Sequence, residues 1–245
     1  MKSLSGLIIQ NGIAYGKAHL LVPAAESNKP LDLYINQKEI LHQALKRSTK
    51  AIEKAVQQNA DASNDAISMI FEAHKLMVND PILIDSTERY INEGMDAYHA
   101  YKKATDQVIE QFQQLTNDYM RNRIIDIQDA TDRVLYSIQN SEYEQRLTFD
   151  TPRVLVVQSI KPSLILGLDK RHVCGFLIEK GSYDQHASLI AREKNIPGMI
   201  VEDIVSIIHS EDWILVDANQ GKVYINPTHA IVQSYNLKGV ETDEL

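Results

Sequence analysis

The sequence predicts a mixed α+β and α/β fold, in which an α/β unit is interrupted by an all-helical insertion. Three observations lead to this prediction. Apolar, strand-forming runs separated by glycines occur near the start of the chain. From residue 31 to about residue 143, apolar residues recur at helical spacing and no strand pattern occurs. Strand patterns return after Pro152, and because two strands alone are marginally stable, the first strands must pair with this later sheet.

The first strands are expected at residues 7–10 and 17–22. Both runs are rich in apolar residues, and glycine turns at Gly12 and Gly16 separate them. A polar stretch over residues 23–30 follows, and we interpret it as a linker to the helical insertion.

The insertion is expected to contain five helices. The predicted ranges are 41–56, 67–78, 81–94, 96–112 and 119–139. Asp80 and Pro81 are typical of a helix start, Gly94 is typical of a helix end, and Asp96 starts the next helix. Such a set is typical of a helical bundle or of a pair of helical hairpins.

The later part of the chain alternates between strand and helix patterns. The predicted strands are 153–157, 173–179, 199–201, 213–216 and 222–225. The predicted helices are 162–168 and 186–195. These elements would complete the sheet that the first strands begin.

The composition is that of a cytoplasmic protein that binds neither membrane nor nucleic acid. The 245 residues are 44% hydrophobic and 24% charged, enough for a sizeable core in one or two domains. The net charge of −8 disfavours nucleic acid as a partner and favours a basic one. The single cysteine, Cys174, lies in an apolar run and is interpreted as a small core residue. No membrane-length apolar run or signal peptide occurs.

No motif for a resident cofactor occurs. GxGxxG, P-loop, HExxH and clustered Cys/His patterns are absent from the sequence, so we expect no cofactor or metal in this chain. Six histidines do not cluster and are expected to be structural or solvent-facing: His19, His42, His99, His172, His209 and His229.

His186 is the histidine with a chemical context, because it stands where a strand is followed by a helix. The first N–H groups of a helix lack intrahelical partners and lie at the positive end of its dipole, so they could bind a phosphoryl group on this imidazole. Arg192 lies nearly two turns later and must fold back or lie beside the site to contribute. The alternative is a structural histidine satisfied by local hydrogen bonds.

The segment 181–192, followed by Pro197, resembles the active-site motif GGxTSHxxIxAR of enzyme I of the bacterial phosphoenolpyruvate-dependent sugar phosphotransferase system. It resembles more distantly the swivelling phosphohistidine domains of pyruvate phosphate dikinase and phosphoenolpyruvate synthase. The residues Asp184 and Gln185 stand where the family has Thr-Ser. Three other stretches are similar to enzyme I in collinear order, namely 4–18, 71–77 with 126–129, and 215–228.

The resemblance implies a domain organisation. Residues 1–30 and 144–230 would form a discontinuous swivelling phosphohistidine α/β domain, and residues 31–143 a four-helix-type subdomain that binds the phosphocarrier protein HPr. Residues 231–245 would form a linker helix toward a C-terminal domain that binds phosphoenolpyruvate with Mg²⁺. The longer protein would be a homodimer, and this chain alone a monomer.

The implied activity is that of the N-terminal part of phosphoenolpyruvate-protein phosphotransferase. His186 would carry the phosphoryl group from phosphoenolpyruvate to a histidine of HPr, with Arg192, Asp184 and Ser188 as further catalytic residues. This chain alone would not use phosphoenolpyruvate. Two alternatives are a weakened or regulatory interaction module of the enzyme I type, and the swivelling domain of another phosphoenolpyruvate-utilising enzyme.

The resemblance also implies a set of HPr-binding residues. They are His74, Leu76, Met77, Asp80, Leu83, Met120 and Arg123. Methionine suits a surface that adapts to a partner, because its flexible thioether repacks at little cost. The alternative for His74 and for the apolar members of the set is that they pack in the core of the helical bundle.

Overall fold

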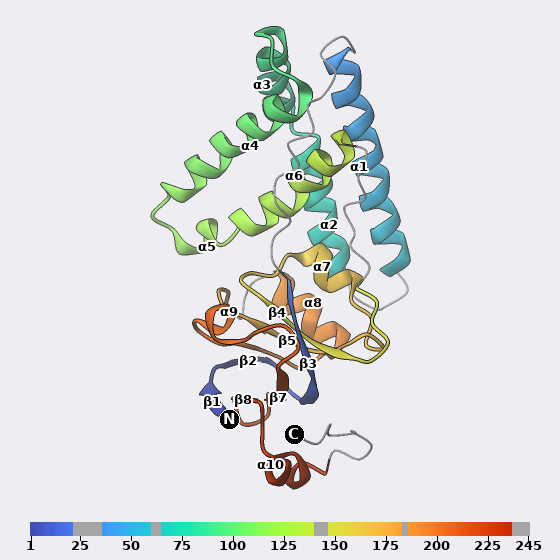
Figure 1. Ribbon diagram of the computed structural model, residues 1–245. Helices are drawn as coiled ribbons and strands as arrows, with labels where there is room; N and C mark the ends of the chain where they lie inside the picture. The colour runs from blue at the N-terminus through green and yellow to red at the C-terminus, as the bar shows by residue number, and fades with distance from the viewer. Residues whose placement is uncertain (22–35, 60–64, 140–146, 183–185, 237–245) are drawn as a thin grey trace. The chain divides into compact units, whose positions relative to one another are not determined.

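The protein is described from a computed structural model that covers residues 1–21, 36–59, 65–139, 147–182 and 186–236 (Figure 1). The chain divides into two compact units. Residues 1–24 and 146–245 form an α/β unit, and residues 25–145 form a helical unit. The predicted boundaries at residues 30 and 143, and the linker helix beyond residue 236, lie outside the described residues.

An eight-stranded mixed sheet organises the α/β unit, with strand order β1-β8-β7-β3-β4-β5-β6-β2. The strands are β1 (Lys2–Ser5), β2 (Leu7–Gln10), β3 (Ile13–Leu21), β4 (Arg153–Val157), β5 (Val173–Ile178), β6 (Gly198–Ile200), β7 (Trp213–Asp217) and β8 (Lys222–Ile225). Strand β3 pairs in parallel with β4 and antiparallel with β7. This pairing confirms that the first strands join the later sheet.

The N-terminal segment connects the two edges of the sheet. Strand β1 pairs with β8 at one edge and β2 pairs with β6 at the other, although only Gly6 separates β1 from β2. The Gly6 N–H donates to the Gly221 carbonyl at 3.1 Å. A Cβ atom on Gly6 would lie 2.2 Å from the Ile200 carbonyl oxygen, so only glycine fits where the edges meet.

The sheet is buried on both faces where its strands are parallel. In β4, Val154 and Val156 belong to the main core cluster, while Leu155 and Val157 are also buried. Consecutive residues of a strand point to opposite faces of the sheet, so the burial of all four shows that both faces are covered, as is typical of parallel strands. Four short helices are described in this unit besides the sheet: α7 (Pro162–Gly167), α8 (His186–Lys194), α9 (Ile204–Ile207) and α10 (His229–Ser234). Helices α7 and α8 pack against each other, and α8 also contacts β2.

The helical unit contains five helices of 12 to 23 residues and one of four residues in its described part: α1 (Gln37–Asn59), α2 (Asp65–Val78), α3 (Pro81–Asn92), α4 (Ala97–Gln113), α5 (Asp118–Arg121) and α6 (Ile124–Ile138). Helix α1 packs against α2 and α6, and α3 packs against α4 (Figure 1). The predicted starts are confirmed, because the Asp80 carboxylate accepts from the Ile82 N–H and the Asp96 carboxylate accepts from the His99 N–H.

The prediction of one helix over 119–139 is wrong. Asn117 caps the separate helix α5 by accepting from the Tyr119 N–H, and a turn at Asn122 and Arg123 precedes α6. The Arg123 guanidinium donates to the Asp126 carboxylate at 3.2 Å across this turn. No helix in the described ranges is both long enough and apolar enough to cross a membrane.

Candidate functional site

Helix α8 begins at His186, where the sequence predicts a helix start. The preceding strand β5 runs parallel to β4 and β6, so the segment that leads to α8 leaves the sheet at the carboxyl ends of these strands. Ligands of open α/β sheets bind outside these carboxyl ends. The first N–H groups of α8 therefore face a region that is suited to an anionic ligand.

The His186 imidazole lies at the start of α8 and directs one of its nitrogens toward the protein interior. The side chain is half-buried, and its Nδ1 atom is buried. Three neighbours in α8, Ala187, Ile190 and Ala191, are at most 1% exposed and fix the helix on the α/β unit. The fixed helix thus positions the backbone of His186, and phosphoryl transfer in line requires a positioned imidazole.

Ser188 anchors the segment in front of the helix. Its side chain is buried, and its Oγ donates to the Ser182 carbonyl at 2.8 Å. This contact ties the first turn of α8 to Ser182 in the segment that precedes the helix, and the catalytic role of Ser188 stays a prediction. The predicted catalytic residue Asp184 lies outside the described residues, so its role stays a prediction.

Arg192 lies near the opposite end of α8. It lines a pocket of about 440 Å³ together with Ile8, Ile9 and Gln10 of β2 and with Asn11, which follows β2. Six helical positions from His186 correspond to a rise of about 9 Å. The Arg192 guanidinium therefore reaches the imidazole only if its side chain folds back along α8, and its catalytic role stays a prediction.

The predicted HPr-binding residues of the helical unit differ in exposure. Leu76 is 74% exposed, Met120 is 38% exposed, and Met77 is half-buried. His74 and Leu83 are 1% and 6% exposed, which places both in the core of the helical unit. For these two residues the structure agrees with the core-packing alternative, because a buried side chain is not available to a partner.

The polar members of the set have structural contacts. Asp80 caps α3, as described above. The Arg123 guanidinium, besides its contact with Asp126, lies 4.4 Å from the centre of the Tyr119 ring. Both residues thus fix the ends of helices that carry exposed apolar side chains.

Other exposed apolar side chains of the helical unit are absent from the predicted set. Nine large hydrophobic residues are exposed in the described part of the chain, and six of them are in this unit. Leu76 and Met120 belong to the predicted set, whereas four others do not: Met69, Ile82, Leu115 and Tyr119. Met69 lies two turns before Leu76 on the same side of α2, a spacing that could have identified it.

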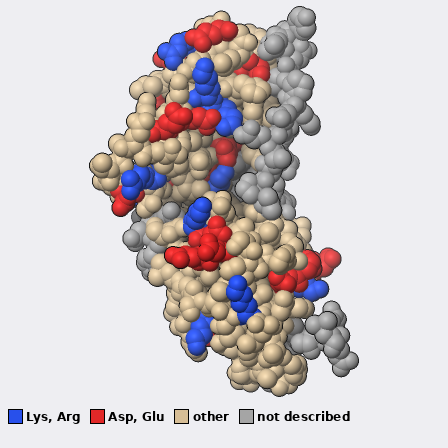
Figure 2. Space-filling view, turned by 60° about the vertical axis from the view of Figure 1, so that its left-hand side comes forward, with Lys and Arg blue, Asp and Glu red and all other residues tan. Residues whose placement is uncertain are grey.

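Charged side chains of both signs are interspersed over the described residues on the face shown in Figure 2. This distribution does not form the basic patch typical of nucleic-acid binding. Within the described ranges, no group of three or more His, Cys, Asp or Glu side chains is arranged to hold a metal ion.

Cys174 is half-buried in β5, and burial raises the pKa of its thiol to about 11. The raised pKa favours the folded state below the ordinary thiol pKa, and this contribution is lost as the pH rises toward 11. We expect iodoacetamide at pH 8 to alkylate Cys174 much more slowly in the folded protein than in urea, because the thiolate is the reacting form. Equal alkylation rates in both states would contradict this prediction.

Two family models match the chain. Residues 5–123 match the model "PEP-utilising enzyme, N-terminal", and residues 149–221, which include α8, match "PEP-utilising enzyme, mobile domain". The chain belongs to the family of PEP-utilising enzymes. His186 lies in the part of the chain that matches the mobile domain of these enzymes.

Similar PEP-utilising relatives are named phosphoenolpyruvate-protein phosphotransferase. The protein from Staphylococcus carnosus is 31% identical over 242 residues, and the protein from Latilactobacillus sakei is 29% identical over 243 residues. Both alignments cover 97% of this chain and 42% of the relative. The chain therefore spans less than half the length of these relatives.

Two solved structures show the same fold. An NMR solution structure of Enzyme I matches with a TM-score of 0.69 and 24% identity, and covers 96% of this chain and 97% of that chain. A structure of the "N-terminal domain of Enzyme 1 - Nitrogen" matches with a TM-score of 0.63 and 19% identity, over 95% and 98% of the two chains. The predicted combination of an α/β unit with a helical insertion is thus confirmed as a known architecture.

Proposed function

We propose that this chain is the phosphoryl-carrying part of a phosphoenolpyruvate-protein phosphotransferase. His186 accepts a phosphoryl group that originates from phosphoenolpyruvate bound by a further domain, and donates it to a histidine of HPr. The observation that carries the proposal is the position of His186 at the first residue of α8, beyond the carboxyl ends of the parallel strands, in a PEP-utilising enzyme. The Mg²⁺ predicted for the longer protein belongs to the donor domain.

The chemistry requires an accessible imidazole nitrogen. Because Nδ1 is buried, we assign the attack on phosphorus to Nε2. A P–N bond forms at Nε2 while the bond from phosphorus to the enol oxygen of phosphoenolpyruvate breaks, and the enolate takes up a proton to give pyruvate. In the second transfer the P–N bond at His186 breaks as a bond to the HPr imidazole forms. The N–H groups at the start of α8 stabilise the equatorial phosphoryl oxygens in both steps.

The second transfer runs in both directions, so it can be tested without the donor domain. Incubation with phosphorylated HPr should place one acid-labile phosphate on this chain. ³¹P NMR should assign the phosphate to Nε2, which gives a signal distinct from that of an Nδ1 phosphoramidate. A chain that takes up no phosphate would contradict the proposed phosphoryl transfer. Phosphate on Nδ1 would contradict the assignment of the attack to Nε2.

HPr is proposed to dock on the exposed apolar side chains of the helical unit. We expect Leu76→Ala and Met120→Ala to weaken HPr binding by about fivefold or more, since removal of an energetically dominant docking contact costs about 1 kcal/mol or more. Neither change should lower the melting temperature, because both side chains are exposed. Leu83→Ala should instead destabilise the fold by about 2–5 kcal/mol, because Leu83 is a core residue.

Calorimetric titration of HPr and thermal melts measure the two effects. Gln113→Ala, an exposed polar change on α4, serves as the control and should alter neither. Wild-type affinity in both the Leu76 and the Met120 variants would exclude this docking face.

The alternative function is a non-catalytic interaction module. The observation in its favour is Asp184-Gln185 in place of the Thr-Ser that the resemblance leads one to expect. Such a module would bind HPr with normal affinity but would accept no phosphate from phosphorylated HPr. The two experiments above therefore separate the two functions.

A further inference from the structure

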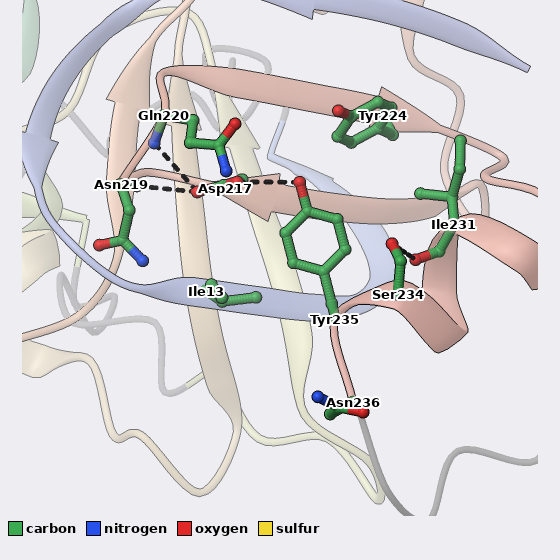
Figure 3. A pocket seen from close by; sticks show the side chains of 9 residues that line it. All are labelled: Ile13, Asp217, Asn219, Gln220, Tyr224, Ile231, Ser234, Tyr235 and Asn236. Carbon is green, nitrogen blue, oxygen red and sulfur yellow. Dashed lines mark hydrogen bonds between the residues drawn. The ribbon is translucent and has the colours of Figure 1, made fainter.

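A polar pocket of about 480 Å³ lies between the β7–β8 hairpin and α10, away from His186 in the sequence (Figure 3). The lining residues include Asp217 and Asn219 from the hairpin and Tyr235 and Asn236 after α10. None of the residues that line the pocket is Lys, Arg or His. Among the described residues, the pocket thus contains one carboxylate and no positive side chain.

Among the described residues, only neutral groups donate hydrogen bonds to the buried carboxylate of Asp217. It is 1% exposed, its Oδ1 accepts from the N–H groups of Asn219 and Gln220 at 3.0 Å, and its Oδ2 accepts from the Tyr235 hydroxyl at 2.8 Å. No salt bridge joins Asp217 to a basic side chain within the described residues. A carboxylate has about four acceptor positions, and three of those of Asp217 are used, so one remains for a ligand. No basic side chain of the described residues balances the negative charge of this carboxylate.

The tyrosines complete the pocket. The rings of Tyr224 and Tyr235 lie 6.3 Å apart at 63°, so an edge of one faces the other. Burial, followed by the interactions with Tyr224 and Asp217, raises the pKa of Tyr235, so its hydroxyl stays a neutral donor at physiological pH. The two rings provide apolar surface for an alkyl group and aromatic faces that attract a cation.

We propose that this pocket binds a small organic ammonium ion. The ammonium group donates to the remaining acceptor position of Asp217 and to the exposed amide oxygens of Asn219 and Gln220. Its alkyl part contacts the tyrosine rings. An anionic ligand is disfavoured, because it would meet the buried carboxylate of Asp217 without a basic side chain from the described lining residues. This inference is independent of the function proposed for His186.

The test is a titration of the ¹⁵N-labelled chain with ethylammonium chloride, compared with the same concentrations of sodium chloride. The ammonium ion should selectively shift the backbone N–H signals of Asn219, Gln220 and Tyr235. The absence of selective shifts would overturn the proposal.

Two charge variants sharpen the test. Asn219→Lys places an ammonium group at the pocket entrance from an exposed position, so it should weaken ethylammonium binding by about tenfold or more. Gln113→Lys adds the same charge on the helical unit and should leave the binding unchanged. Equal binding by the wild type and the Asn219 variant would overturn the proposal, and thermal melts verify that both variants are folded.

Discussion

Replacement of His186 by alanine is expected to abolish acid-labile phosphorylation of this chain by phosphorylated HPr. The imidazole is the group that forms the P–N bond, and alanine has no nucleophile. The fold should persist, because alanine favours helices and the buried residues that attach α8 are unchanged. The phosphate released by acid treatment measures phosphorylation, and a melting curve of the same sample measures folding. The two measurements together distinguish loss of phosphoryl transfer from loss of the fold.

His209→Ala is the matched control for this experiment. The His209 side chain is 85% exposed and lies in the same α/β unit, so its removal should leave both labelling and stability unchanged. Label that persists at the wild-type level on His186→Ala would assign the phosphoryl group to another histidine.

Gly6→Ala is expected to destabilise the α/β unit by about 3 kcal/mol or more, since overpacking a dense site costs about 1–3 kcal/mol and more where backbone must move. The new Cβ would lie 2.2 Å from the Ile200 carbonyl oxygen and 2.7 Å from Val201 Cγ2. Relief of the backbone clash requires that the N-terminal segment move away from the end of β6. Urea unfolding measures the loss.

Gly167→Ala provides the control, because no atom lies within 4 Å of a Cβ at that position. It should be neutral or slightly stabilising, by up to about 1 kcal/mol. A second variant identifies the cause: Val201→Ala removes the side-chain clash but leaves the Ile200 oxygen, so it should not rescue Gly6→Ala. Equal stability of the Gly6 and Gly167 variants would show that the segment has room to move.

The sequence was most informative where local chemistry determines structure. The starts of α3 and α4 follow from an aspartate that caps the first N–H groups, and Pro81 adds a preset backbone angle. The bounds of β8 and the start of α8 at His186 were likewise predictable, because apolar runs with flanking turn residues mark them.

Features that depend on tertiary contacts were not predictable. Strand β1 has little apolar character, and its strand conformation follows from pairing with β8. The break between α5 and α6 was not visible in the apolar spacing. Ile82 and Leu83 are adjacent apolar residues, yet one is 75% exposed and the other is 6% exposed, because the packing of α3 on α4 determines which side faces inward. The sequence alone therefore identified the helices of the candidate docking face and two of its exposed side chains, Leu76 and Met120, but not which of Ile82 and Leu83 faces inward.

The pairing of the N-terminal strands has a consequence for biosynthesis. Strands β1, β2 and β3 leave the ribosome before the helical unit, but their partners are β4, β6, β7 and β8, all of which are made after the entire helical unit. The helices of the insertion pack mainly on one another, so this unit can form its core while residues 2–21 still wait for partners. The sheet can therefore close only after the helical unit has been made, and β2 pairs beside the helix that carries His186 only after residues 198–200 have been synthesised.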